Sequence, residues 1–217
     1  MKSVVLLSSG LDSSVCFAEE VHAGRAVLAL TFDYGQRAAE RELLMAKAQA
    51  DKAGVPHRVV KLDFFSQFSA NALTSTSIDV PTSQVDIDSM EASVESAKSV
   101  WVPNRNGIFL SIAAGFAESC GAGLVVTGFN VEEAATFPDN TKDYMEKFTS
   151  SLSFSTSNKV RISSPTVDMD KTQIYKRGIE LGVDFSVVWP CYFSGDQACG
   201  QCESCQRFER AKKKATV

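Results

Sequence analysis

Apolar strand-like runs alternate with helical patterns along the first 62 residues of this chain. β-Branched and leucine-rich runs occupy 4–7, 26–32 and 58–62, and helical spacing covers 13–23 and 37–53 between them. Short connections between strands and helices in this order favour a parallel sheet with helices on both faces. We therefore predict a doubly wound α/β fold, in which ligands bind beyond the carboxyl ends of the strands.

The rest of the chain continues this alternation and completes a mainly parallel sheet of five strands. With 217 residues the chain suits one such domain, predicted over 1–185, followed by a small C-terminal segment over 186–217. The further elements that we predict are strands at 124–127 and 160–162 and helices over 108–120, 141–151 and 170–182.

One long stretch interrupts the pattern. Residues 66–73 have the spacing of a helix, but 74–100 are rich in Ser, Thr, Asp and Glu and have no clear period. A loop of this length in a compact domain is usually a lid, a binding segment or a disordered connection. We predict that 74–100 form a long loop that is partly mobile without ligand, with a tolerated surface insertion as the alternative.

The loop after the first strand combines serines with one glycine and one aspartate. Backbone N–H groups and hydroxyls gathered at a helix N-terminus bind anions, most often phosphate. The loop lacks both the Gly-Lys-Ser/Thr of a Walker A motif and the Gly-x-Gly-x-x-Gly of a dinucleotide site. An ordinary serine-capped turn is the alternative. The candidate binding residues are Leu7, Ser8, Ser9, Gly10, Leu11, Asp12, Ser13 and Ser14.

This loop resembles the Ser-Gly-Gly-x-Asp-Ser pyrophosphate loop of ATP pyrophosphatases, enzymes that cut ATP between its α and β phosphates. Ser9 departs from that pattern, because the family usually has its first glycine there. The resemblance implies ATP binding by this loop and a sheet of the adenine nucleotide alpha hydrolase type.

Four of the six cysteines lie close together near the C-terminus. Their spacing, C-x7-C-x2-C-x2-C, suits a tetrahedral zinc site, and four thiolates leave no open coordination position for catalysis. The zinc would therefore be structural and would fold a segment too short to have its own core. An iron–sulfur cluster is the alternative. The four candidate ligands are Cys191, Cys199, Cys202 and Cys205, whereas Cys16 and Cys120 are predicted to be small buried residues.

Charge and hydropathy exclude several classes of partner. The formal net charge of −4 gives no general attraction to nucleic acid or to an anionic membrane. No run of 18 apolar residues occurs, and the chain enters its first strand at once, without room for a signal peptide. We expect a cytoplasmic protein with no membrane association and no direct contact with nucleic acid.

Several separated motifs occur in the order seen in 7-cyano-7-deazaguanine synthases. They are the serine loop, Phe-Asp-Tyr-Gly-Gln at 32–36, Val-Pro-Asn-Arg-Asn at 102–106, Asp-Lys-Thr at 170–172 and the cysteine cluster. The match covers nearly the whole chain. Its implied activity is the ATP-dependent conversion of 7-carboxy-7-deazaguanine and ammonia to 7-cyano-7-deazaguanine, in the biosynthesis of queuosine-type tRNA bases.

The resemblance implies two successive adenylations. A carboxylate oxygen attacks the α-phosphorus of ATP, and ammonia displaces AMP from the acyl-adenylate to give an amide. A second adenylation, on the amide oxygen, then yields the nitrile. Each activation expels pyrophosphate, and catalysis of such transfers consists mainly of positioning and charge stabilisation.

Roles for individual residues follow from the same resemblance. The serine loop would hold the β and γ phosphates, and Asp12 would hold Mg²⁺. Arg105 and Lys171 would neutralise the phosphates or the departing pyrophosphate. Asp33 and Tyr34 would lie near the adenosine. Ordinary surface ion pairs are the alternative for the acids and for Arg105. A homodimer is also implied.

The segment 131–140 departs most from the family pattern. The family commonly has Asp-Tyr-Ser-Gly followed by Tyr-Pro-Asp-Cys here, whereas this chain has two adjacent glutamates and Asn140 in place of the cysteine. The paired carboxylates would accept hydrogen bonds from a guanine-like N–H edge, or would mark a relative that passes the activated acid to another acceptor. The predicted substrate contacts are Glu132, Glu133, Phe137 and Asp139.

Two other functions compete with this interpretation. One is a different ATP pyrophosphatase, such as a tRNA thiolase or an amide synthetase. The acidic balance disfavours a tRNA-acting enzyme, and sulfur transfer needs exposed reactive cysteines. The other is a non-catalytic nucleotide sensor or a zinc-ribbon binding module, which the acids and bases at strand and helix ends disfavour.

Overall fold

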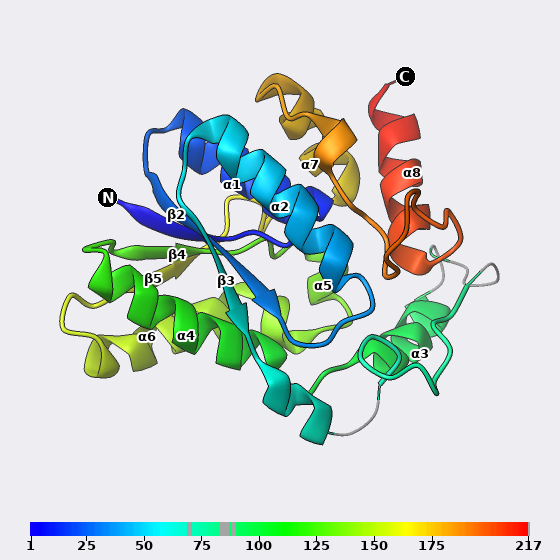
Figure 1. The fold of residues 1–217 in the computed structure, drawn as a ribbon, viewed down its shortest axis with the longest axis horizontal. Helices are drawn as coiled ribbons and strands as arrows, with labels where there is room; N and C mark the ends of the chain where they lie inside the picture. Colours follow the sequence, from blue (N-terminus) through cyan, green and yellow to red (C-terminus); the bar gives the residue numbers. More distant parts are fainter. Residues whose placement is uncertain (69–70, 83–86, 88–89, 217) are drawn as a thin grey trace.

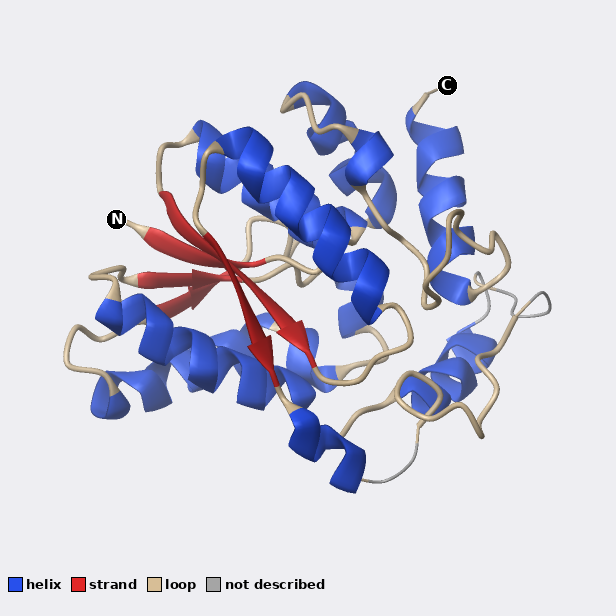
Figure 2. Cartoon of the chain, viewed as in Figure 1, coloured by secondary structure: helices blue, strands red, loops and turns tan. Residues whose placement is uncertain are grey.

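Five parallel strands form one twisted sheet with helices on both faces (Figures 1 and 2). The computed structural model describes residues 1–68, 71–82, 87 and 90–216. The strand order is β3-β2-β1-β4-β5, and every neighbouring pair is parallel, which confirms the doubly wound fold. The strands are β1 (Ser3–Leu6), β2 (Ala26–Asp33), β3 (His57–Lys61), β4 (Leu124–Val126) and β5 (Arg161–Ser163).

The side chains of the central strands pack alternately against the two helical layers. Val5 packs with Phe17 on one face of the sheet, and Val4 packs with Ala113 on the other. Because both faces are covered, the central strands β1, β2 and β4 are mainly apolar rather than alternating with polar residues, whereas β3 and β5 at the sheet edges carry charged residues. The covering helices are α1 (Leu11–His22) and α2 (Ala39–Ala53) on the first face, and α4 (Arg105–Ser119) and α6 (Lys142–Ser155) on the second.

The last two helices join the first helical layer. Ile174 of α7 (Lys171–Glu180) and Ala211 of α8 (Glu203–Ala215) pack in one buried cluster with Leu11 of α1. Among the described residues, no helix is both long and apolar enough to cross a membrane. The remaining short elements are η1 (Asp63–Gln67), α5 (Val131–Ala134), η2 (Pro138–Asn140) and η3 (Phe185–Val187). The boundary between 1–185 and 186–217 stays a prediction.

The prediction of a long loop over 74–100 is wrong for its C-terminal part, which contains α3 (Met90–Val100). Four residues of α3 are buried at helical spacing. Two of them are serines, so the sequence shows no apolar period here. Residues 83–86 and 88–89 of the expected loop lie outside the described residues. The buried positions are Ser93, Ser96, Ala97 and Val100.

The helix expected over 66–73 is also wrong. The 3₁₀ helix η1 ends at Gln67, and the side chain of Asn71 accepts hydrogen bonds from the N–H groups of Leu73 (3.0 Å) and Thr74 (3.1 Å). An Asn side chain that bonds to the backbone two residues on favours a turn over a helix. Residues 69–70 are not described.

The topology determines where a ligand can bind. The chain runs from β1 outward to β2 and β3, and then returns to the other side of β1 for β4 and β5. The connections that follow β1 and β4 therefore diverge to opposite faces of the sheet. Such a switch point leaves a crevice at the carboxyl ends of the strands.

Candidate functional site

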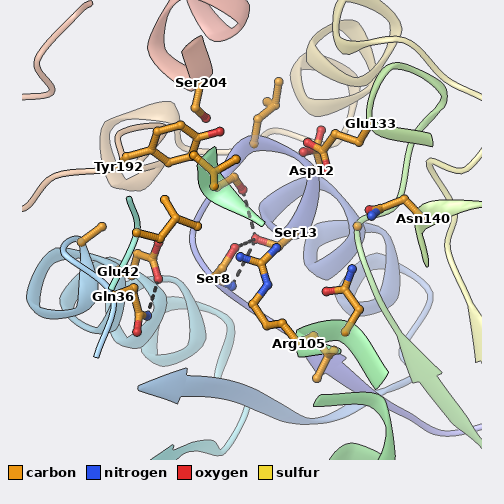
Figure 3. Close-up of a pocket in the computed structure, with 18 of the residues that line it drawn as sticks. Ser8, Asp12, Ser13, Gln36, Glu42, Arg105, Glu133, Asn140, Tyr192 and Ser204 are labelled. Atoms are coloured by element: carbon orange, nitrogen blue, oxygen red, sulfur yellow. Dashed lines mark hydrogen bonds between the residues drawn. The ribbon is translucent and has the colours of Figure 1, made fainter. Parts of the chain in front are cut away.

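A cavity of about 310 Å³ lies at this switch point (Figure 3). Its size is within the range of ordinary small-molecule sites, about 300–1,000 Å³. The predicted site residues that line it are Leu7, Ser8, Gly10, Leu11, Asp12, Ser13, Tyr34, Arg105, Glu132, Glu133, Phe137, Asp139, Lys171 and the cysteine Cys191. The other predicted site residues do not line this cavity: Ser9, Ser14, Asp33, Cys199, Cys202 and Cys205.

Ser13 organises the loop between β1 and α1. Its hydroxyl donates to the carbonyl oxygen of Gly10 (3.1 Å) and accepts from the backbone N–H of Ser8 (3.2 Å). The hydroxyls of Ser8 and Ser13 are 3.1 Å apart. These bonds fold the loop over the first turn of α1, where the positive end of the helix dipole favours an anion.

Ser9 has the left-handed backbone conformation that favours the glycine usual at this position in the family. Its φ angle is +62°, in the left-handed region that glycine enters without strain and that costs other residues about 1–2 kcal/mol. The residue is fully buried, and its carbonyl oxygen accepts a hydrogen bond from the N–H of Trp189 (2.8 Å). This chain therefore keeps the turn that a glycine usually makes, at some cost in strain.

Lys171 connects two acids from different helices. Its ammonium group contacts Asp12 Oδ2 at 2.5 Å and Glu133 Oε1 at 2.6 Å, and its side chain is only 10% exposed. Burial opposes the charge on Lys171, but the two acids outweigh it and raise the lysine pKa above its ordinary value. Burial raises the pKa of Asp12 to about 6 against the pull of Lys171. The three side chains are therefore two acids and one permanently charged lysine, and their net charge is negative when both acids are ionised.

Three polar atoms at the loop are buried without a hydrogen-bond partner among the described residues. They are Asp12 Oδ1, Ser9 Oγ and Ser14 Oγ. Such atoms cost about 1–3 kcal/mol each unless something else satisfies them. The unsatisfied carboxylate oxygen of Asp12, which lines the cavity, suits a hard divalent cation, whereas Ser9 and Ser14 do not line the cavity.

Arg105 begins α4 and points into the cavity (Figure 3). Its Nη1 donates to the hydroxyl of Tyr34 at 3.2 Å, and its guanidinium lies 5.8 Å from the centre of the Tyr34 ring. Within the described part of the chain no acid forms an ion pair with Arg105. A guanidinium without an acidic partner in a cavity wall is suited to bidentate contact with a phosphate.

The two adjacent glutamates have different environments. Glu133 pairs with Lys171, whereas the oxygens of Glu132 are occupied by other donors. Glu132 Oε1 accepts from the backbone N–H of Lys171 (2.9 Å), and Oε2 accepts from Arg207 (2.8 Å) and Arg210 (2.5 Å) of α8. A direct substrate contact by Glu132 stays a prediction, and its observed contacts connect α5, α7 and α8.

Two cavity residues that the sequence analysis missed are Gln36 and Glu42. Gln36 Nε2 donates to Glu42 Oε2 (2.8 Å), and the Gln36 amide is itself held by Phe32 O and by the N–H of Tyr34. Burial raises the pKa of Glu42 to about 7 from 4.5, although the Gln36 hydrogen bond acts in the opposite direction. In sequence, Glu42 was one of many charges on a helix, and nothing distinguished it.

Replacing Glu42 with glutamine is expected to stabilise the protein selectively at high pH. Folding raises the pKa of Glu42, so the protonated acid is compatible with the folded state at low pH. As pH rises from the unfolded pKa through about 7, the folded state must bury a charged carboxylate, and the free energy of unfolding falls. The difference in Tm between Glu42→Gln and wild type should therefore become more positive from pH 5 to pH 8.5, by about 3 °C or more. Thermal melts at both pH values measure it.

The control for this prediction is Glu40→Gln, which removes an exposed acid from the same helix. We expect its Tm difference from wild type to stay constant between the two pH values. A constant difference for Glu42→Gln as well would show that the Glu42 carboxylate is well solvated.

The four C-terminal cysteines converge on one point. Their sulfur atoms all lie within 4.8 Å of one another, and Cys199 Sγ is 3.9 Å from Cys205 Sγ. Four thiolates about 2.3 Å from a zinc ion would be about 3.8 Å apart at tetrahedral angles. The N–H groups of Phe193 and Cys202 donate to cysteine sulfurs at 3.4 and 3.3 Å, as suits thiolates. The four residues therefore fit a tetrahedral metal site.

The six cysteines are all unpaired. Cys16 is buried, as predicted, and its thiol contacts Thr166 at 3.3 Å. The prediction of a buried Cys120 is wrong, because the residue follows the last turn of α4 and is exposed there.

The strand order and the serine loop define a doubly wound α/β protein of the pyrophosphate-loop class. NMN synthetase from Francisella tularensis shares this fold, with a TM-score of 0.51 at 15% identity, covering 100% of this chain and 87% of that one. A 4-thiouridine synthetase, solved with RNA and bound ATP, has a TM-score of 0.51 at 18% identity, covering 99% of this chain and 50% of that one.

Sequence comparison identifies the family. The profile described as "Queuosine biosynthesis protein QueC" matches residues 2–216. A 7-cyano-7-deazaguanine synthase from Bdellovibrio bacteriovorus is 52% identical, covering 100% of this chain and 94% of that protein. One from Pelotomaculum thermopropionicum is 50% identical, covering 99% and 98%. This chain belongs to the 7-cyano-7-deazaguanine synthase family, which confirms the resemblance seen in its motifs.

Proposed function

We propose that this protein is an ATP-dependent ligase that converts 7-carboxy-7-deazaguanine and ammonia to 7-cyano-7-deazaguanine. The observation that carries the proposal is one cavity that joins the serine loop, a lysine held by two acids and the arginine at the start of α4. Family membership supplies the substrate, and the cavity supplies groups for the two adenylations that a carboxylate-to-nitrile conversion needs. The proposed location is the cytoplasm, where thiols stay reduced, and the proposed assembly is a homodimer.

ATP would lie across the carboxyl ends of β1 and β2. The hydroxyls of Ser8 and Ser13 and the N–H groups at the start of α1 would bind the β and γ phosphates. Tyr34 would lie near the adenosine, with Asp33 close behind it. This arrangement would direct the α-phosphorus toward the β4 side of the cavity, where the carboxylate substrate would attack it.

Asp12 would hold Mg²⁺ through its buried, unsatisfied Oδ1. Mg²⁺ prefers oxygen ligands, and when bound it would neutralise phosphate charge. Lys171 and Arg105 would add positive charge where pyrophosphate departs. Lys171 stays protonated at neutral pH because of its two acidic neighbours, so it acts as a fixed charge rather than as a base.

The cysteine cluster would hold structural Zn²⁺. Cys191 lines the cavity, and the neighbouring Trp189 donates to Ser9 O of the serine loop. Metal binding would therefore support one wall of the site, without entering the chemistry, because four thiolates leave no open coordination position.

Turnover by the purified protein tests the proposal. Pyrophosphate and AMP release from ATP would be measured with and without 7-carboxy-7-deazaguanine and ammonium, while mass spectrometry follows the deazapurine. We expect release that requires the acid and ends in the nitrile. Accumulation of the adenylate or amide would instead favour a different acceptor, as the altered 131–140 segment would allow. ATP binding without turnover would favour a nucleotide sensor.

A further inference from the structure

Two aromatic rings from separate connections lie parallel in the cavity wall. The rings of Trp101 and Phe137 are within 8° of parallel, with centroids 6.1 Å apart. Trp101 lies between α3 and α4, and Phe137 lies between α5 and η2. Both line the cavity. We call this pair the aromatic platform.

The platform differs from the other stacked aromatic pairs among the described residues. The centroids of the other stacked pairs are 4.1 Å apart for Phe32 and Phe109, 4.2 Å for Tyr175 and Phe185, and 5.0 Å for Phe64 and Phe65. The platform has the widest spacing of these described pairs, and Trp101 is 37% exposed. An exposed tryptophan that borders a cavity leaves ring surface for a ligand to cover.

Two polar residues follow Phe137 along the chain, after Pro138. Asp139 and Asn140 line the same cavity, and Asn140 Nδ2 donates to Asp139 Oδ1 at 3.0 Å. This bond orients the Asp139 carboxylate, which lines the same cavity as the platform. Proteins that read a single unstacked base combine aromatic stacking on its faces with hydrogen bonds to its Watson–Crick edge. The N–H groups on the edge of a guanine-like ring suit a carboxylate acceptor.

We propose that the aromatic platform binds the bicyclic ring of the deazaguanine substrate by stacking, with Trp101 as a specificity-determining residue. This inference rests on the proposed function and adds Trp101, to which the sequence analysis assigned no role. Stacking holds a planar substrate without using its carboxylate. The carboxylate therefore stays free to meet the α-phosphorus near the serine loop.

Trp101→Leu tests the proposal through substrate kinetics. Base–aromatic stacking is worth about 1–3 kcal/mol, so we expect KM for 7-carboxy-7-deazaguanine to rise about 5- to 150-fold. KM for ATP should change less than about twofold. Trp101→Phe should recover most of the loss, because it restores a ring. The matched control is Phe154→Leu, which removes a 91% exposed ring from α6 and should change neither KM.

Fluorescence gives a second readout that does not need turnover. The chain has two tryptophans, so Trp101→Phe leaves Trp189 alone. Because Trp189 also lines the cavity, the readout is the difference between the two proteins. We expect 7-carboxy-7-deazaguanine to quench a larger fraction of the wild-type emission than of the Trp101→Phe emission, whereas ATP alone should change both proteins to the same extent. Quenching by ATP alone that is present in the wild type and lost in Trp101→Phe would assign the platform to adenine and overturn the proposal. So would an unchanged KM in a Trp101→Leu variant that still folds. Absence of wild-type turnover, by contrast, would count against the proposed function itself.

Discussion

Replacing Asp12 with asparagine is expected to lower kcat for pyrophosphate release by about 10²- to 10³-fold, as does removal of a group that stabilises charge in a transition state. The amide would keep the size of the side chain but lose the charge that suits a divalent cation. The protein should stay folded at 25 °C, because Lys171 retains its contact with Glu133 (2.6 Å). Burial already opposes the charge on Asp12, so its loss also removes a cost of folding.

The measurement is a steady-state assay of pyrophosphate release at saturating ATP and Mg²⁺, with a thermal melt of the same sample. Asp143→Asn is the matched control, since it removes an exposed acid that pairs with Lys147 on α6. Exposed ion pairs contribute little, so this variant should behave as wild type in both assays. Wild-type release by Asp12→Asn would exclude Asp12 from the site.

The sheet could be predicted from sequence because helices cover both of its faces. Buried parallel strands are continuous apolar runs, so β1 and β2 stood out, and each predicted strand boundary lies within a residue or so of the observed one. The order of elements then placed the ligand crevice at their carboxyl ends. Fold class and site location were therefore both available without a structure.

Helix α3 could not be predicted in the same way. Ser93 and Ser96 occupy buried positions where apolar residues would have marked a helix. They are buried because each has a partner on α8: Ser96 donates to Glu203 (2.6 Å), and Ser93 accepts from Arg207 (3.1 Å). Such pairing joins residues more than 100 positions apart, and no local pattern reveals it.

In the candidate site, too, local sequence patterns predicted some residues, and only tertiary contacts reveal the others. Asp12, in the first turn of α1, and Tyr34, after β2, were both predicted to lie near bound ATP, and both line one cavity. Glu42 was missed because its burial depends on the packing of α2 near Gln36. The contrast between Glu132 and Glu133 was missed because it depends on two arginines of α8. Sequence indicated which segments meet, whereas tertiary contacts determine which side chains are already occupied.

Cysteine substitution is expected to have the largest effect on stability. We predict one zinc ion per chain by metal analysis, and its loss in Cys202→Ser, whose native side chain is fully buried in the cluster. Structural zinc sites supply about 10 kcal/mol or more of apparent binding free energy. Since 1 kcal/mol corresponds to about 2–4 °C for a chain of this size, Tm should fall by at least about 10 °C. A strong chelator should have the same effect on the wild type.

The control is Cys120→Ser, which removes an exposed thiol far along the chain from the cluster and should keep both zinc and Tm. The same metal analysis distinguishes zinc from an iron–sulfur cluster, because a cluster would give iron and acid-labile sulfide instead of zinc.

Loss of metal should also weaken substrate turnover, because the backbone N–H of Trp189, two residues before Cys191, donates to the carbonyl oxygen of Ser9 in the serine loop. If Cys202→Ser retained its zinc and its Tm, the cluster would not be a metal site. If it lost zinc at an unchanged Tm, metal binding would be separate from folding, and the segment would depend instead on the packing of α8 against α7.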